Sequence, residues 1–433
     1  MHIALLISHS PSPHTVGQWR LPGSWRSVSS DPMAFWQHIA RTTERGCFDM
    51  VFLADAYSLH DAYRSTGEDT IRYAVQYPRL DPLPLVPVMA QATRNLGFAA
   101  TASTTFLPPY WTARHFATLD HLTEGRIGWN VVTSYARSEA ANFGIDDIPD
   151  HDARYDRAEE YLELCYRLWD SWEPGAVVAD RETGVYADPA KVHRIDFKGK
   201  YFRCEGPLHV PRSPQGRPFI IQAGSSPRGL AFAGKHAEAV FAVRHDPAGM
   251  KRQREKLEQA AVAAGRAPDA PKILWGILPV VGETRGQALR KQQAIFDNIE
   301  IEAGLAMMSG HFNYDLSKFP IDQPLPKIDA AQGIQGQIAM VVEDLSDKMT
   351  LGDVAKKFAS GIAPHVVGTA SEIADQMEAL LDQGGGHGFM LVTHALPGSV
   401  DDFVDLVVPE LQRRGRFRSR YDNRMLRDRF EQG

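Results

Sequence analysis

Polar side chains stand where the short apolar runs of this sequence end. They are Ser8, His9, Asp55, Thr101, Ser103, Asn130, Thr133, Ser134, Gln222, Ser225, Ser226, Arg244, Thr393 and His394. Hydroxyl, amide and imidazole groups of this kind bind a polar organic ligand, whereas metal-dependent hydrolysis needs a cluster of His, Asp or Glu. We therefore expect a site for an organic ligand and no metal. A metal-dependent barrel hydrolase, drawing on His9, His14 and Asp55, is the alternative.

A turn at Gln222–Gly229 leads from one apolar run into a helical pattern. It places the hydroxyls of Ser225 and Ser226 at a helix N-terminus, where free N–H groups and the helix dipole favour an anion such as a phosphate. An ordinary helix cap explains the same residues equally well. His151 and Tyr155, four residues apart at the start of a long helical pattern, share a face that could hydrogen-bond a phosphate or a polyol chain.

The polar side chains named above lie at or near the ends of eight apolar runs of strand length. Each run is followed by a segment whose apolar residues have helical spacing. The runs are Ile3–Ser8, Met50–Ala54, Leu96–Thr101, Ile127–Thr133, Phe219–Ala223, Ala239–Val243, Ile273–Val281 and Phe389–Thr393. This alternation predicts a (β/α)8 TIM barrel, whose functional side chains gather at the carboxyl ends of the strands. A doubly wound sheet is the alternative, but no G-x-G-x-x-G follows the first run, so a nicotinamide-binding fold loses its main support.

Two helices are marked clearly. Asp31 can cap the first, which begins at Pro32 and can end at Gly46. The second is expected over Asp152–Trp172, because its apolar residues fall on one face and its charged residues on the other.

Three long stretches interrupt the alternation, at about 56–83, 173–217 and 303–366. Long insertions on a barrel commonly form the rim of its site, so we expect a single domain over 1–433 with these three insertions. An arginine-rich tail follows at 413–433. Because acidic residues are interleaved with its arginines, the tail is expected to pack across a neighbouring subunit and not on RNA.

Composition excludes several classes of protein. The chain has 433 residues, 43% of them apolar, and a net charge of −6, which is typical of a globular enzyme and argues against nucleic-acid or membrane-surface binding. Its three cysteines are far apart, which indicates reduced thiols. The first residues lack a signal-peptide pattern and no apolar run approaches about 18 residues, so a cytoplasmic location is expected.

Several longer motifs resemble one known family. They are Trp129–Ser134, Glu139–Gly144, His151–Ala158, Ala187–His193, Val210–Gly216 and Gln222–Gly229. These segments are similar to the flavin-dependent monooxygenases of the bacterial-luciferase superfamily, in the branch that contains the nitrilotriacetate, dibenzothiophene-sulfone and pristinamycin-pathway monooxygenases. The resemblance extends over nearly the whole chain.

The resemblance implies a luciferase-like barrel that takes reduced FMN, by diffusion, from a separate NAD(P)H:FMN oxidoreductase and uses O2 as co-substrate. It also implies a homodimer or homotetramer. The cofactor-binding positions carried over by motif or strand-end placement are Asp55, Thr101, Ser103, Asn130, His151, Tyr155 and Ser225 or Ser226. The implied catalytic positions are His14 and His311 on the substrate side, with Ser134 beside the flavin.

The corresponding hypothesis is that reduced FMN and O2 form a C4a-peroxyflavin, which oxygenates a small sulfur- or nitrogen-containing or xenobiotic substrate. Such a pocket must exclude water, and few carboxylates suit it. His14 or His311 would transfer a proton, since imidazole titrates near working pH. Arg20, Arg26 and Arg64 could meet an anionic group of the substrate. A hydrocarbon monooxygenase and a non-catalytic flavin-binding protein are the alternatives.

Overall fold

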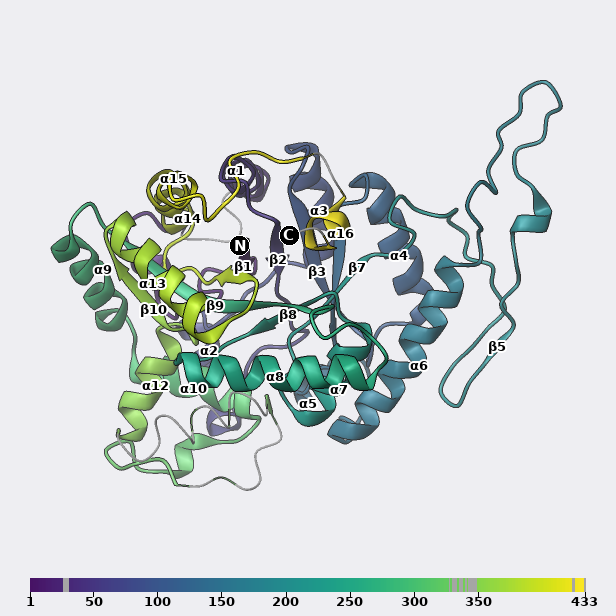
Figure 1. The fold of residues 1–433 in the computed structure, drawn as a ribbon. Helices are drawn as coiled ribbons and strands as arrows, with labels where there is room; N and C mark the ends of the chain where they lie inside the picture. The colour runs from purple at the N-terminus through teal and green to yellow at the C-terminus, as the bar shows by residue number, and fades with distance from the viewer. Residues whose placement is uncertain are drawn as a thin grey trace.

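A closed parallel barrel forms the body of the molecule in the computed structural model, which describes residues 1–25, 31–326, 328, 333–334, 338, 341, 349–422 and 425–431 (Figure 1). Its strands are β1 (His2–Ile7), β2 (Met50–Leu53), β3 (Gly97–Ser103), β4 (Ile127–Val132), β7 (Phe219–Gln222), β8 (Ala239–Ala242), β9 (Lys272–Val281) and β11 (Gly388–Leu391). They pair in the order β9, β11, β1, β2, β3, β4, β7, β8, and β8 returns to β9. The predicted (β/α)8 barrel is confirmed, and each strand lies within one of the eight predicted runs or at most two residues beyond it.

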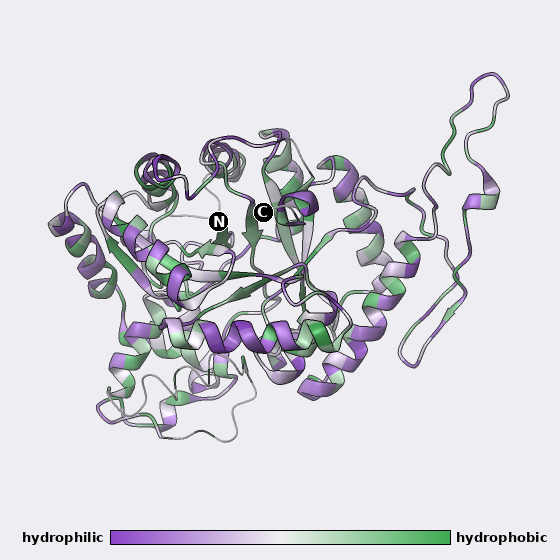
Figure 2. Cartoon of the chain, viewed as in Figure 1, coloured by the Kyte–Doolittle hydropathy of each residue, from purple (hydrophilic) through white to green (hydrophobic). Residues whose placement is uncertain are grey.

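Alternation along the strands divides the core into two layers. Ala4 and Leu6 of β1 point into the barrel, whereas Ile3, Leu5 and Ile7 pack outward against the helices. Because side chains alternate between the two faces of a strand, continuous apolar runs fill both layers. Figure 2 shows the strands mainly in hydrophobic colours, while the outer helix α8 (Pro247–Ala263) is largely hydrophilic toward the viewer.

Helices cover the barrel on its outer side. They are α1 (Pro32–Arg45), α3 (Pro82–Gln91), α4 (Pro109–Leu122), α6 (His151–Trp169), α7 (Pro227–His236), α8, α9 (Arg285–Asp297), α13 (Ala370–Gly384), α14 (Gly398–Asp402) and α15 (Val408–Arg413). None of the described helices combines the length and the apolar character needed to cross a bilayer.

Local sequence explains where the two predicted helices begin and end. The Asp31 carboxylate accepts a hydrogen bond from the Ala34 N–H at 3.0 Å and so caps α1 before Gly46 ends it, as predicted. Helix α6 ends at Trp169, earlier than the predicted Trp172. The Ser171 hydroxyl donates to the Leu168 carbonyl at 2.6 Å, and Trp172 instead bridges to Val192 at the start of an insertion.

The three predicted insertions fold differently from one another. The first holds the short α2 (Glu68–Arg72) at the carboxyl end of the barrel. The second forms an arm that extends far from the barrel and carries the small hairpin of β5 (Phe197–Lys198) and β6 (Arg203–Cys204) (Figure 1). The third contains α10 (Ile301–Phe312), α12 (Leu351–Ala359) and β10 (His365–Gly368), a strand that sequence analysis missed and that pairs with the second half of β9.

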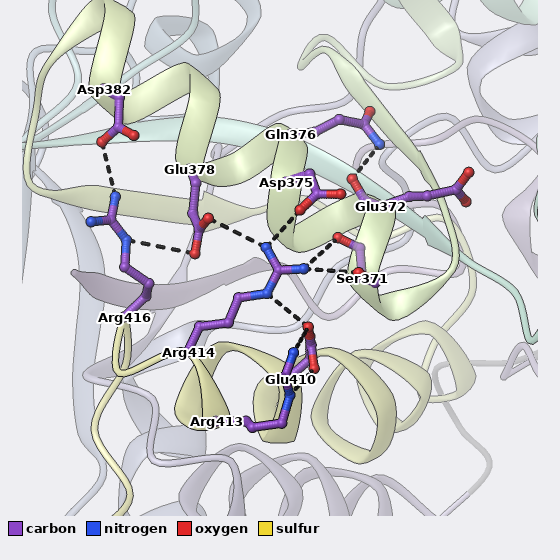
Figure 3. Close-up of polar contacts among 10 residues, drawn as sticks. All are labelled: Ser371, Glu372, Asp375, Gln376, Glu378, Asp382, Glu410, Arg413, Arg414 and Arg416. Atoms are coloured by element: carbon purple, nitrogen blue, oxygen red, sulfur yellow. Dashed lines mark hydrogen bonds and ion pairs between the residues drawn. The ribbon is translucent and has the colours of Figure 1, made fainter.

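The described part of the arginine-rich tail packs against its own barrel. Arg414 donates to Glu410 and Asp375 at 2.7 Å and lies 3.3 Å from Glu378, and Arg416 pairs with Asp382 at 2.9 Å, so the tail is held on α13 (Figure 3). Intersubunit packing is therefore not needed to explain these arginines. Asn423, Arg424 and the last two residues lie outside the described part of the chain.

At the amino end of the barrel, residues from both ends of the chain contact the buried carboxylate of Asp49, which lies directly before β2. It accepts hydrogen bonds from the Ile3 N–H at 2.8 Å and pairs with Arg418 at 2.7 Å and with His2 at 3.1 Å. Phe430 of α16 (Leu426–Glu431) stacks on the His2 ring at 4.2 Å. Burial alone would raise the pKa of Asp49, but His2, Arg418 and the hydrogen bonds hold it well below its ordinary value.

Candidate active site

A cavity of about 300 Å³ opens at the carboxyl ends of the strands, at the end of the barrel opposite Asp49. Most of the predicted site residues line it: His14, Asp55, Asn130, Ser134, His151, Tyr155, Ser225, Ser226 and His311. Residues far apart in the sequence meet here because parallel strands end at one rim. The cavity lies within the size range of small-molecule sites.

Thr101 and Ser103 are the predicted residues that do not line the cavity. The Thr101 hydroxyl donates to the Leu53 carbonyl at 2.8 Å and accepts from the Asn130 amide at 2.8 Å. Ser103 accepts from the Ser134 hydroxyl at 3.0 Å. Both residues therefore lie behind the cavity wall, where they contact Asn130 and Ser134, and their direct contact with a cofactor stays a prediction.

One end of the cavity is built from the turn before α7. The Ser226 hydroxyl accepts from the Gly229 N–H at 3.0 Å and lies 3.2 Å from His151 Nε2. The glycine at 224 allows a close approach, since a Cβ there would lie 2.9 Å from the Tyr155 hydroxyl oxygen. These residues meet as predicted, and the helix N-terminus makes this end suitable for a phosphate.

Buried polar atoms without partners support a polar ligand in the cavity. Among the described residues, Arg154 Nε, Asn130 Oδ1 and His14 Nε2 are fully buried and make no hydrogen bond. Each belongs to a residue that lines the cavity. Because a buried polar atom without a partner costs free energy, these three atoms are suited to a ligand that supplies the missing partners, as the phosphate, polyol and ring amides of FMN would.

At the opposite end of the cavity, Asp55 and Arg79 lie near each other without forming a hydrogen bond. The Asp55 carboxylate is 9% exposed and lies 3.9 Å from the Arg79 guanidinium, which is beyond hydrogen-bond distance. Burial raises the pKa of Asp55 to about 7, with Arg79 opposing the rise. Asp55 is therefore partly protonated near neutral pH.

Gln76 joins two histidines beside this pair. Its Nε2 donates to the Pro13 carbonyl at 2.8 Å, which turns Oε1 toward His60 Nε2 at 3.0 Å and His311 Nε2 at 3.2 Å. An amide oxygen can only accept, so both imidazoles carry a proton on Nε2. Burial lowers the pKa of His60 to about 4, and the hydrogen bond that His60 donates to Gln76 opposes this shift.

His14 does not titrate as expected. Burial, with the nearby charge of Arg79, lowers its pKa to about 3, so its imidazole is neutral throughout the neutral range. The prediction that His14 titrates near working pH is corrected for the ligand-free cavity. Its neutral ring can still form hydrogen bonds with a ligand.

Sequence analysis missed His60, Gln76, Arg79 and Glu139 as lining residues. Glu139 is 3% exposed and accepts from the backbone N–H groups of Tyr57 and Ala136 at 3.1 and 3.2 Å, which holds the loop after β2 against α5 (Arg137–Asn142). The first three lie in the 56–83 insertion, where no periodicity indicates which side chains face inward. The described residues contain no cluster of three His, Cys, Asp or Glu side chains suited to a metal.

Known proteins resemble this chain over nearly its whole length. The model of the family described as luciferase-like monooxygenase matches residues 2–388. The chain is 42% identical to a dibenzothiophene-sulfone monooxygenase of Rhodococcus erythropolis, with 99% of this chain and 96% of the relative covered. It is also 42% identical to a long-chain alkane monooxygenase of Geobacillus thermodenitrificans, with 96% and 90% covered. A crystal structure of riboflavin lyase with modified FMN and riboflavin superposes with a TM-score of 0.92 at 36% identity, covering 100% and 96% of the two chains.

Proposed function

Since the chain belongs to the luciferase-like monooxygenase family, we propose that it is the oxygenase of a two-component system that uses reduced FMN and O2. A separate NAD(P)H:FMN oxidoreductase would supply the reduced flavin. The observation that carries this proposal is the cavity, which has a turn suited to a phosphate at one end and a cluster of His, Gln, Asp and Arg side chains at the other.

The residues at the two ends fit the parts of FMN. Ser225, Ser226 and His151 would hold the phosphate at the N-terminus of α7, and Tyr155 would meet the ribityl chain. Asn130 would offer its unpartnered Oδ1 to a ring N–H. When bound, reduced FMN supplies the electrons that activate O2.

The remaining side chains limit proton transfer and water. Leu6, Phe52, Phe241 and Met307 give the cavity apolar walls. The Glu139 carboxylate is already occupied by backbone N–H groups, and Asp55 is the other lining carboxylate among the described residues. Apolar walls and few carboxylates suit oxygen chemistry that stray protons would divert to peroxide.

His311 is the residue proposed to move a proton at the substrate. Gln76 fixes a proton on His311 Nε2, at a position in the cavity wall beside Met307. His14 stays neutral and would accept or donate a hydrogen bond without titrating. His311→Ala is expected to lower turnover with excess reduced FMN at least tenfold, and His14→Ala is expected to act mainly on substrate binding. Unchanged kinetic constants in both variants would remove this assignment.

A polar substrate suits the cavity better than a hydrocarbon. A long-chain alkane is the substrate named for one relative, but it would leave the N–H groups of the buried Arg79 guanidinium without a hydrogen-bond acceptor. A sulfur- or nitrogen-containing substrate can supply acceptors to these groups. We therefore place this chain with oxygenases of heteroatom substrates.

Anaerobic titration of the protein with reduced FMN tests whether FMN is the cofactor. Binding is measured from the change in the tryptophan fluorescence of the protein. We expect reduced FMN to bind at least tenfold more tightly than oxidised FMN. Ser226→Ala should weaken this binding, whereas Thr284→Ala, which removes the equivalent cap of α9, should not. Subsequent mixing with ¹⁸O2 and a candidate thioether should place ¹⁸O in the product. No binding of reduced FMN would contradict the proposed function, and binding without any labelled product from a broad substrate panel would favour a non-catalytic flavin protein.

A further inference from the structure

Arg79 is a buried cation whose hydrogen-bonding capacity is unused. Its side chain is 12% exposed, and its Nε is fully buried with no partner. Its shortest charged contact is the 3.9 Å approach to Asp55, and no described residue accepts a hydrogen bond from its guanidinium. A guanidinium has five N–H donors in a fixed fork, so a ligand that enters the cavity meets an unfilled set of donors.

The described neighbours of Arg79 do not fill the hydrogen-bonding positions of its guanidinium. Asp55 is partly protonated near neutral pH, since burial raises its pKa to about 7. His14, His60 and Gln76 line the same part of the cavity, and all three are uncharged there, with both histidine pKa values at about 4 or below. Of the two carboxylates that line the cavity among the described residues, Asp55 lies 3.9 Å from Arg79 and Glu139 accepts from backbone N–H groups, so the donors of Arg79 stay available to a ligand.

The position of Arg79 separates it from the turn assigned to the phosphate. Arg79 pairs with the residue that follows β2, whereas Ser225 and Ser226 follow β7. In the barrel, β3 and β4 lie between these strands, so the two positions are three strand spacings, roughly 14 Å, apart along the wall. One phosphate cannot satisfy both ends, and the cavity presents a second place for an anion.

We propose that Arg79 binds a carboxylate or sulfonate group of the substrate, so that this monooxygenase acts on small organic anions. A bidentate oxyanion fills the two outer nitrogens of the fork and neutralises the buried charge. The substrate atom to be oxygenated then lies beyond the anion, on the side of His311 and Met307. The inference rests on the proposed function for the reaction, but the anion site itself can be tested without turnover.

The rim arginines named from the sequence do not provide this site. Arg20 pairs with Glu300 at 3.1 Å and is 41% exposed, and Arg64 pairs with Asp69 at 3.4 Å and is 53% exposed. Both are solvated and already matched, so they contribute little to binding of an anion. Arg26 lies outside the described residues. We therefore expect Arg79, and not Arg20 or Arg64, to bind the anionic group of the substrate.

Pairs of near-isosteric ligands test the charge requirement. The probes are (methylthio)acetate and (methylthio)acetamide, and 3-(methylthio)propionate with its amide, titrated into FMN-loaded protein by calorimetry. The wild type is expected to bind each anion at least tenfold more tightly than its amide. Arg79→Met should remove this preference, and Arg79→Lys, which keeps a point charge without the fork, should retain part of it. Arg72→Met, an exposed change of equal charge in the same insertion, is the control and should behave as the wild type.

Two results would overturn the proposal. One is equal binding of anion and amide, or no binding of any anion, by the folded wild type. The other is a large loss of FMN affinity in Arg79→Met or Arg79→Gln with an unchanged anion preference, which would assign the guanidinium to the carbonyl oxygens of the flavin ring. Anion selectivity in a protein that does not bind reduced FMN would contradict the proposed function and leave the anion site standing.

Discussion

Strand β2 carries a buried aspartate at each end, and the two have opposite surroundings. Asp49, at the amino end, accepts from the Ile3 N–H and pairs with His2 and Arg418 within 3.1 Å. Asp55, at the carboxyl end, has only the 3.9 Å approach of Arg79 as a charged partner among the described residues. The pKa of Asp49 is held well below its ordinary value, whereas burial raises that of Asp55 to about 7.

The comparison distinguishes a structural carboxylate from one that is prepared for a ligand. Complete hydrogen bonding around Asp49 compensates its burial and locks the two chain ends to the barrel. Incomplete partners around Asp55, Arg79 and His14 leave polar groups that the protein alone does not satisfy. Unsatisfied polarity at one end of a barrel therefore indicates the site better than the mere presence of charged residues does.

Removal of the structural carboxylate is expected to have the largest effect. Asp49→Ala leaves Arg418, His2 and the Ile3 N–H without their acceptor in a buried position. We expect a loss of roughly 3–5 kcal/mol in the free energy of unfolding, measured as the shift in urea midpoint. Asp146→Ala, an exposed change of the same type, serves as the control. A midpoint equal to that of the control would refute the structural role.

The pH dependence of stability should separate the two aspartates. A raised pKa in the folded state means that the folded protein binds more protons than the unfolded chain between about pH 4 and 7, so the contribution of Asp55 to stability falls as pH rises through that window. Asp49 behaves oppositely, and its contribution is lost as pH falls below about 4.

The difference in the free energy of unfolding between Asp55→Asn and the wild type isolates the contribution of Asp55. The buried histidines titrate in the same pH window in both proteins, so their contribution cancels. We expect the variant to gain roughly 3 kcal/mol relative to the wild type from pH 4.5 to 7.5, measured by urea unfolding at each pH. A constant difference would show that Asp55 ionises normally.

Binding of reduced FMN should be more sensitive to Asp55 than to Asp49. If Asp55 contacts FMN, as the family resemblance implies, Asp55→Asn should weaken binding roughly tenfold, about 1.4 kcal/mol, through the loss of one charge-assisted hydrogen bond. The measurement is the dissociation constant under anaerobic conditions at pH 8, with Asp146→Ala as the control. An unchanged constant would place Asp55 outside the flavin contact.

Two adjacent arginines in the tail should give the smallest effects. Arg414 is 17% exposed among Glu410, Asp375 and Glu378, whereas Arg413 is 70% exposed with Glu410 alone (Figure 3). We expect Arg414→Met to cost about 1 kcal/mol and Arg413→Met to cost less, measured by thermal or urea unfolding. Equal losses would mean that burial and the number of partners do not decide the strength of these pairs.

Sequence patterns located the barrel strands and the ends of α1, because buried parallel strands and capped helices leave local signals. Strand β10 escaped detection because it directly follows Pro364 and begins inside the stretch interpreted as the third insertion. Most predicted site residues line the cavity because strand ends are fixed by the fold. Arg79, Gln76 and His60 could not be predicted, since their direction depends on tertiary contacts such as the Pro13 carbonyl that orients Gln76.

The contacts between the two ends of the chain also limit the order in which the barrel can fold. Strand β1 needs β11 as its neighbour, and Asp49 needs Arg418 of the tail, so contacts separated by nearly the whole sequence close the barrel. Such non-local contacts form late in folding. During translation one edge of β1 is therefore open until β11 has left the ribosome, which exposes the nascent chain to misassembly over that interval.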